Sequence, residues 1–151
     1  MWDIKGQIKS ASEVLKINFK EIPASEVEGL RVSISSKYAE NKKNAPLWEN
    51  LTDNIGINNS EAWKWIGDFI GNSKVIMFFD TTEEKSAFEF NCGNDVVAVL
   101  SETYNFEFYT TNYDTQYLLC FNHHDVLIAC GKAVDWLKNY SKQKESQILR
   151  Y

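Results

Sequence analysis

The fold is decided by residues 75–140, VIMFFDTTEEKSAFEFNCGNDVVAVLSETYNFEFYTTNYDTQYLLCFNHHDVLIACGKAVDWLKNY, where one pattern occurs twice at an offset of 30 residues. Each copy contains two apolar strands joined by a polar turn, followed by an Asp at the start of an apolar helix. The matching pairs are Phe78 and Phe108, Thr81 and Thr111, Asp95 and Asp125, and Val96 and Val126. This number of identities is near what chance would give. We therefore interpret the repeat only as evidence for the architecture, namely two hairpin–helix units.

The local pattern of this stretch predicts its individual elements. Apolar runs place strands at 75–79, 87–91, 106–111 and 117–121, and turn-forming polar residues separate the two members of each pair. A helix is expected after Asp95. A second helix is expected over 126–140, after Asp125, because its apolar side chains fall within one half of a helical wheel.

Alternation along the strands predicts two different sheet faces. Along 106–111, phenylalanines alternate with Glu107 and Tyr109, and along 87–91 they alternate with Glu89. We expect the phenylalanine face to be covered by the two helices. The opposite face, which carries the acids and Tyr109, is expected to be open.

The first half of the chain has a weaker pattern. Apolar residues three or four positions apart predict an amphipathic helix over 4–15, followed by a short connection at 19–23. Residues 25–39 suit either a helix or a strand, with the helix favoured, and this choice decides whether the sheet has four strands or five. A loop is expected at 53–59 and a helix over 61–70.

These elements predict a single α+β domain over residues 1–151. It would contain a helical N-terminal part (1–71), the hairpin–helix repeat (75–140) and a polar tail (141–151). The sheet would be a single layer, mixed or antiparallel, of four to five strands packed against helices.

The charge of the chain is concentrated in its middle. The 21 acidic and 16 basic residues give a net charge of −5, and the segment from Asp80 to Asp125 holds nine carboxylates against one cation, Lys85. Such a field argues against binding to nucleic acid or an anionic membrane, because both would require neutralised phosphates. It suits a basic protein partner, although acidity that serves only solubility remains an alternative.

Cysteine usage and hydropathy predict a cytoplasmic protein. The three cysteines, Cys92, Cys120 and Cys130, form an odd set that suits reduced thiols. No apolar run reaches the 18 residues of a spanning helix, and the start of the chain lacks the pattern of a signal peptide.

The turn Asn122–Asp125 holds both histidines and is the strongest candidate for chemistry. A metal phosphohydrolase site would need a third His, and Cys120, His123, His124 and Cys130 do not have the spacing of a zinc site. A cysteine nucleophile would have to be exposed, whereas both thiols lie within apolar runs. Since the glycines are also scattered singly, we predict no catalytic residue, metal or cofactor.

Three segments, FEFYTTN (106–112), YLLCFNHHD (117–125) and GKAVDW (131–136), resemble the C-terminal half of small immunity proteins. These are the antitoxins of polymorphic toxin systems, including LXG-type systems, in Bacillus-like bacteria. The segment around Trp48 and the helix Trp63–Gly71 extend the resemblance to about residues 45–140. It implies a non-enzymatic cytosolic protein that binds and blocks a cognate toxin, often a nuclease.

Charge and strand parity then predict where a basic toxin would bind. The expected partner-binding residues lie on the open sheet face and the adjoining hairpin loops, and they are Asp80, Glu83, Glu84, Glu89, Glu107, Tyr109 and Asp114. The alternatives are a small hydrolase or transferase that uses the Asn122–Asp125 turn, and an adaptor for another basic protein. The partner's identity and the oligomeric state stay open.

Overall fold

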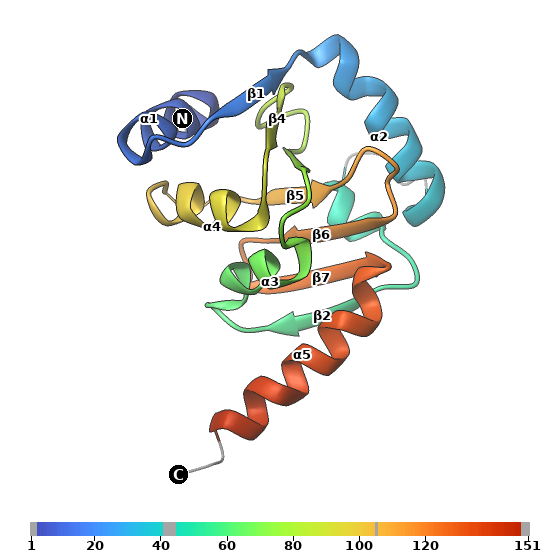
Figure 1. The fold of residues 1–151 in the computed structure, drawn as a ribbon. Helices are drawn as coiled ribbons and strands as arrows, with labels where there is room; N and C mark the ends of the chain where they lie inside the picture. The colour runs from blue at the N-terminus through green and yellow to red at the C-terminus, as the bar shows by residue number, and fades with distance from the viewer. Residues whose placement is uncertain (1–2, 41–44, 105, 149–151) are drawn as a thin grey trace.

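A computed structural model describes residues 3–40, 45–104 and 106–148, and within them the protein forms one antiparallel sheet of seven strands (Figure 1). The strand order is β1-β4-β3-β5-β6-β7-β2. The strands are β1 (Phe19–Ile22), β2 (Ile55–Asn58), β3 (Val75–Phe78), β4 (Ala87–Phe90), β5 (Phe108–Thr111), β6 (Tyr117–Phe121) and β7 (Val126–Gly131). The α+β class is thus confirmed, but the predicted count of four to five strands is wrong.

Five α-helices accompany the sheet in this described part of the chain. They are α1 (Ile4–Leu15), α2 (Ala24–Tyr38), α3 (Ile66–Ile70), α4 (Gly93–Ser101) and α5 (Ala133–Ile148), with two short 3-10 helices, η1 (Leu47–Asn50) and η2 (Ala62–Trp65). The ambiguous segment 25–39 is therefore helical, as favoured. The expected helix 61–70 is formed by η2 and α3 together.

Both edge strands come from the first half of the chain, which was predicted to be helical. β1 lies where a connection was expected and pairs with β4, with Phe19 opposite Phe90. β2 lies within the expected loop 53–59 and pairs with β7, with Ile55 opposite Ala129. Each strand has only four residues, too few for alternation to stand out, and each is fixed by its partner's backbone rather than by its own pattern.

The predicted helix 126–140 is wrong in its first half, where β7 forms. Leu127 and Ala129 lie in the core on one face of the sheet, while Ile128 and Cys130 lie in the core on the other. A strand that is buried on both faces reads as a continuous apolar run, which periodicity does not distinguish from a buried helix.

β7 ends at Gly131, whose φ of +64° lies in the left-handed region that glycine adopts without strain. The chain turns there from the strand into α5. α5 then extends through Ile148, so the predicted polar tail 141–151 is helical over most of its length. Residues 149–151 lie outside the described part.

The repeat therefore holds for the hairpins and fails for the helices. Asp95 and Val96 lie in α4, whereas Asp125 and Val126 lie in a turn and a strand. Even in the first unit, α4 begins at Gly93, two residues before the expected Asp95. At this position α4 lies close to α3, and only a glycine fits there. A Cβ on Gly93 would lie 2.6 Å from the carbonyl oxygen of Gly67.

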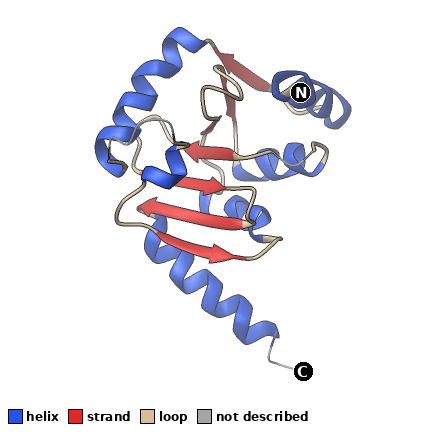
Figure 2. Cartoon of the chain, turned by 180° about the vertical axis from the view of Figure 1, so that it is seen from behind, coloured by secondary structure: helices blue, strands red, loops and turns tan. Residues whose placement is uncertain are grey.

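The sheet has an apolar core on each face. The two opposite views show that helices lie on both sides of the sheet (Figures 1 and 2). One core contains Phe88, Phe90 and Phe108 together with apolar residues of α1, α3, α4 and α5. The other contains Phe78 and Tyr109 and is covered by α2 and η1. The expectation of an open face is wrong, since Tyr109 is completely buried.

Polar contacts explain why the cover of this second face was missed. Only Val27 and Ile34 of α2 are buried. Polar side chains add to this apolar contact: Arg31 donates to the carbonyl oxygens of Phe79 and Glu84, and Tyr38 donates to that of Thr115. A helix attached in this way has little apolar periodicity for the sequence to display.

Candidate functional site

The candidate site lies at one end of the sheet, where β3 and β6 end and β5 and β7 begin. Antiparallel pairing brings these strand ends together, and the register places Phe108 opposite Phe121. The residues next to this pair are Glu107, which precedes β5, and the Asn122–Asp125 turn, which joins β6 to β7. Glu107 and both histidines of the chain therefore lie at the same end of the sheet.

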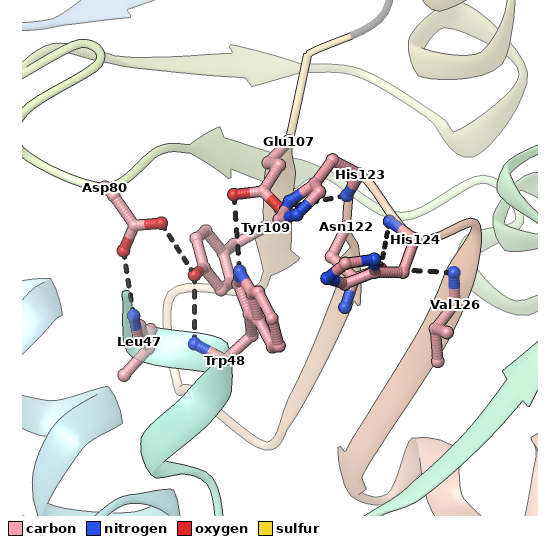
Figure 3. A network of polar contacts seen from close by, with 9 residues as sticks. All are labelled: Leu47, Trp48, Asp80, Glu107, Tyr109, Asn122, His123, His124 and Val126. Carbon is pink, nitrogen blue, oxygen red and sulfur yellow. Dashed lines mark hydrogen bonds and ion pairs between the residues drawn. The ribbon is translucent and has the colours of Figure 1, made fainter. Parts of the chain in front are cut away.

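A chain of hydrogen bonds, which we call the Trp48 network, connects Asp80, Tyr109, Trp48, Glu107 and His123 (Figure 3). The Tyr109 hydroxyl donates to Asp80 Oδ2 at 2.9 Å and accepts from the backbone N–H of Trp48 at 3.1 Å. The Trp48 indole Nε1 donates to Glu107 Oε1 at 3.2 Å. Trp48 thus attaches η1 to the sheet through both its backbone N–H and its indole N–H.

Glu107 ends the network in a close pair with His123. Its Oε2 lies 2.5 Å from His123 Nδ1 and also accepts the backbone N–H of His123 at 2.9 Å. The side chain of Glu107 is 21% exposed, whereas that of His123 is 62% exposed. The carboxylate is held in place by three hydrogen-bond contacts while the imidazole faces solvent.

Asn122 organises the turn that carries the histidines. Its buried side-chain Oδ1 accepts the backbone N–H groups of His124, at 2.9 Å, and Val126, at 3.2 Å. Asp125 adopts a left-handed φ of 59°, a conformation that Asp and Asn tolerate better than most residues. Asp125 therefore belongs to a hairpin turn, and its expected role at the start of a helix is wrong.

A pocket of about 370 Å³ opens beside this turn, and we call it the sheet-end pocket. Its walls come from the starts of α1 and β5, η2, the end of α4 and the two neighbouring turns. Its lining residues are Ile4, Trp63, Glu83, Leu100, Thr103, Tyr104, Phe106, Glu107, Phe108, Phe121, Asn122, His123 and Asp125. The described lining thus combines three carboxylates and five aromatic rings and contains neither Lys nor Arg.

Five of the seven predicted partner-binding residues lie around this end of the sheet. Asp80, Glu107 and Tyr109 belong to the Trp48 network, and burial raises the pKa of Tyr109 far above its ordinary value. Glu83 and Glu84 lie in the turn between β3 and β4, where the Glu84 carboxylate accepts the backbone N–H of Ser86.

The other two predicted residues, Glu89 and Asp114, lie toward the opposite end. Glu89 accepts a hydrogen bond from Tyr113, and the backbone carbonyl of Asp114 accepts one from Lys37. Both contacts involve the turn between β5 and β6, which leads away from the pocket. The predicted set is therefore divided between two separate surfaces.

Five further residues line the pocket without having been predicted to bind a partner, and they are Trp63, Phe106, Phe121, His123 and Asp125. The sequence did contain a signal that the turn with His123 and Asp125 lies next to Glu107. Pairing the expected strands 106–111 and 117–121 around their short loop places Glu107 almost opposite Asn122, and hence next to the histidine turn. Trp63 gave no such signal, since only the tertiary fold brings η2 to this place.

The two buried thiols bear on the alternative of a cysteine nucleophile. Cys120 is completely buried, which raises its pKa well above the usual range, and burial raises the pKa of Cys130 to about 12. A nucleophilic cysteine needs a lowered thiol pKa and access to substrate. Among the described residues, no group of three or more His, Cys, Asp and Glu side chains has the arrangement of a metal site.

Fold and site together define an antiparallel α+β protein with a carboxylate-lined pocket at one end of its sheet. Residues 2–141 match the model of a family of unknown function, DUF6756, and the chain belongs to that family. Neither the curated proteins nor the solved structures gave a significant match. No helix in the described ranges combines the length and the apolar character that crossing a membrane requires.

Proposed function

We propose that this protein is a non-catalytic, cytoplasmic immunity protein that binds and neutralises a basic cognate toxin. The observation that supports the proposal is the sheet-end pocket, which is lined by the three carboxylates Glu83, Glu107 and Asp125. A basic partner, such as a nuclease whose active site attracts phosphates, would be complementary to this end of the molecule.

The resemblance to immunity proteins supports a toxin as the partner. The three segments that carry it form parts of β5, β6, β7 and α5, together with the histidine turn. Two of these segments build walls of the sheet-end pocket. The segments that resemble immunity proteins therefore also supply two of the three carboxylates of the pocket, Glu107 and Asp125.

Electrostatics gives this proposal a kinetic consequence. Carboxylates clustered on one surface attract a basic partner before contact, which raises the association rate at low salt. Added salt screens exposed charges over about 10 Å at 0.1 M ionic strength. Association with the toxin should therefore slow as salt is added, with a smaller effect on dissociation.

The first experiment identifies the partner and then measures inhibition. The tagged protein is used to isolate partners from its native host, elution by rising salt separates them, and mass spectrometry identifies them. The candidate is then purified, and its toxic activity is titrated with the protein. We expect complete inhibition at one equivalent. A partner whose activity is unaffected at saturation would contradict the proposal.

Charge reversal locates the binding surface. Glu83→Lys combined with Asp125→Asn should weaken toxin binding by about tenfold or more, because one exposed carboxylate becomes a cation that repels the basic toxin and a second loses its charge. Asn is chosen at position 125 because it tolerates the left-handed backbone there. Asp114→Lys, at the opposite end of the sheet, is the matched control and should have a much smaller effect. Equal loss in both variants would show that only net charge matters.

One observation favours a second candidate, a small hydrolase or transferase. The Glu107 carboxylate lies 2.5 Å from His123 Nδ1 beside the pocket, and such a pair can position an imidazole as a general base. Replacing both histidines by Gln separates the two functions. A toxin-binding protein should retain its affinity within a few-fold, whereas an enzyme should lose its activity. An adaptor for another basic protein would differ from the first proposal only in its partner.

A further inference from the structure

The sheet-end pocket has the chemistry of a site for an organic cation. Glu107 lines it as a carboxylate whose position is already set by Trp48 and His123. Three contacts engage its two oxygens, which can accept about four hydrogen bonds in total. One position on a fixed, partly buried carboxylate therefore stays available to a further donor.

Two more carboxylates line the pocket from the neighbouring turns. Glu83 and Asp125 are exposed, and within the described part of the chain no group donates a hydrogen bond to either side chain. Only His123 adds a basic group to the described lining, and it is paired with Glu107. An occupant that carries positive charge would thus meet several acceptors.

Aromatic rings supply the rest of the wall. Phe106 and Phe121 are partly exposed in the pocket, and Phe121 stacks on the buried Phe108 with ring centroids 6.3 Å apart. The ring of Trp63 already has the ammonium group of Lys64 at 5.4 Å from its centroid. Aromatic faces attract cations, and a planar guanidinium can stack on a ring while it also hydrogen-bonds to carboxylates.

We propose that the sheet-end pocket binds a guanidinium group, specifically an arginine side chain that the partner inserts between the carboxylates and the phenylalanine wall. An arginine matches both features, because its planar guanidinium offers five donors to the carboxylates that line the pocket and its apolar stem can contact the rings. Its source in a partner protein rests on the proposed function. The preference of the pocket for a guanidinium does not.

The pocket can be tested without knowing the partner. N-acetyl-arginine amide is titrated into the isotope-labelled protein, and backbone amide shifts are followed by NMR. The control probe is N-acetyl-citrulline amide, which has nearly the same shape and no charge. We expect the arginine probe to shift residues 83 and 121–125, with a dissociation constant on the order of millimolar. Equal shifts with both probes, or none with either, would overturn the proposal.

Variants connect the binding to the carboxylates. Glu83→Gln combined with Asp125→Asn removes two charges while keeping shape, and Asn tolerates the left-handed backbone at position 125. We expect about tenfold weaker binding of the arginine probe, because charge-assisted hydrogen bonds are lost. Asp114→Asn, the matched control, should leave binding unchanged. Unchanged binding in the double variant would contradict the inference even if the protein binds arginine elsewhere.

A lysine probe and the partner provide the remaining comparisons. N-acetyl-lysine amide should bind several-fold more weakly than the arginine probe, since an ammonium lacks the planar fork. If a toxin binds tightly but the probe does not compete and the double variant keeps full affinity for it, the pocket inference fails and the proposed function stands. If the probe binds at the pocket and no basic partner is found, the function fails and the cation site stands.

Discussion

Tyr109 links the core of the sheet to the candidate site. Its ring is completely buried and stacks on that of Phe78, with ring centroids 5.1 Å apart. Its hydroxyl donates a hydrogen bond to Asp80 and accepts one from the backbone N–H of Trp48. Burial is the main reason why its pKa is raised, so the hydroxyl stays protonated and continues to donate. One residue thus combines core packing with the attachment of η1.

Removing this hydroxyl should destabilise the protein. Tyr109→Phe keeps the ring but leaves a carboxylate oxygen of Asp80 and the N–H of Trp48 without a partner, at a cost of about 1–3 kcal/mol in the free energy of unfolding. Urea denaturation measures the loss. Tyr113→Phe is the control, because this exposed hydroxyl contacts Glu89 at the surface and its removal should cost less than about 0.5 kcal/mol. Equal losses would show that the Trp48 network is not a stabilising unit.

At the scale of elements, charged side chains attach α1 to the edge strand β1. Lys5 Nζ lies 3.0 Å and Lys9 Nζ 3.6 Å from the two carboxylate oxygens of Glu21. The hydrogen bond from Lys5 lowers the pKa of Glu21 below its ordinary value of 4.5, and the same bond raises the pKa of Lys5. Since these groups are accessible to solvent, their contribution to stability is small.

The sign of the shift predicts how this contribution depends on pH. A carboxyl whose pKa is lowered by folding stabilises the protein above its unfolded pKa, near 4.5, and the stabilisation disappears as the pH falls through the folded value. Glu21→Gln should therefore lower the unfolding temperature slightly at neutral pH and have no effect in strong acid. Calorimetry of both proteins between neutral pH and strong acid measures the difference in unfolding temperature. Glu13→Gln, on the exposed side of α1, should not show the same loss at neutral pH.

At the scale of the whole molecule, β1 and β2 cover strands that would otherwise form the edges of the sheet. β1 pairs along all four residues of β4, and α1 packs against α4 in the same region. An uncovered strand edge next to an apolar face is a template for pairing with other chains. α1 and β1 therefore protect β4 from intermolecular pairing as well as adding to the core.

Deletion of residues 1–22 should consequently cause aggregation. The truncated chain would expose the backbone of β4 and the apolar side of α4 that Ile4 and Ile8 now cover. Size-exclusion chromatography with light scattering, at equal concentrations of the full chain and the truncated one, measures the result. A truncated protein that elutes as a monomer with an unchanged unfolding temperature would show that α1 and β1 are accessory elements.

Elements with their own periodicity were predictable from sequence, and elements defined by their neighbours were not. The hairpins β3–β4 and β5–β6, the helix α1 and the helical nature of 61–70 all show local patterns that survive in the structure. β7 was misread because burial on both faces removes alternation. The second sheet face was misread because the alternation along its own strands does not reveal that α2 and η1 cover it.

The sequence by itself determined an acidic α+β chain with two hairpins, and it identified Glu83 and Glu107 among the residues that line the candidate site. Local hydrophobic period and residue charge suffice for those conclusions, because neither depends on distant parts of the chain. Only the tertiary structure decided that β1 and β2 complete the sheet, that Tyr109 is buried, and that a pocket forms beside the histidine turn. The pocket is assembled from five separate stretches of the chain, and their meeting depends on long-range strand pairing and helix packing, which no local pattern encodes.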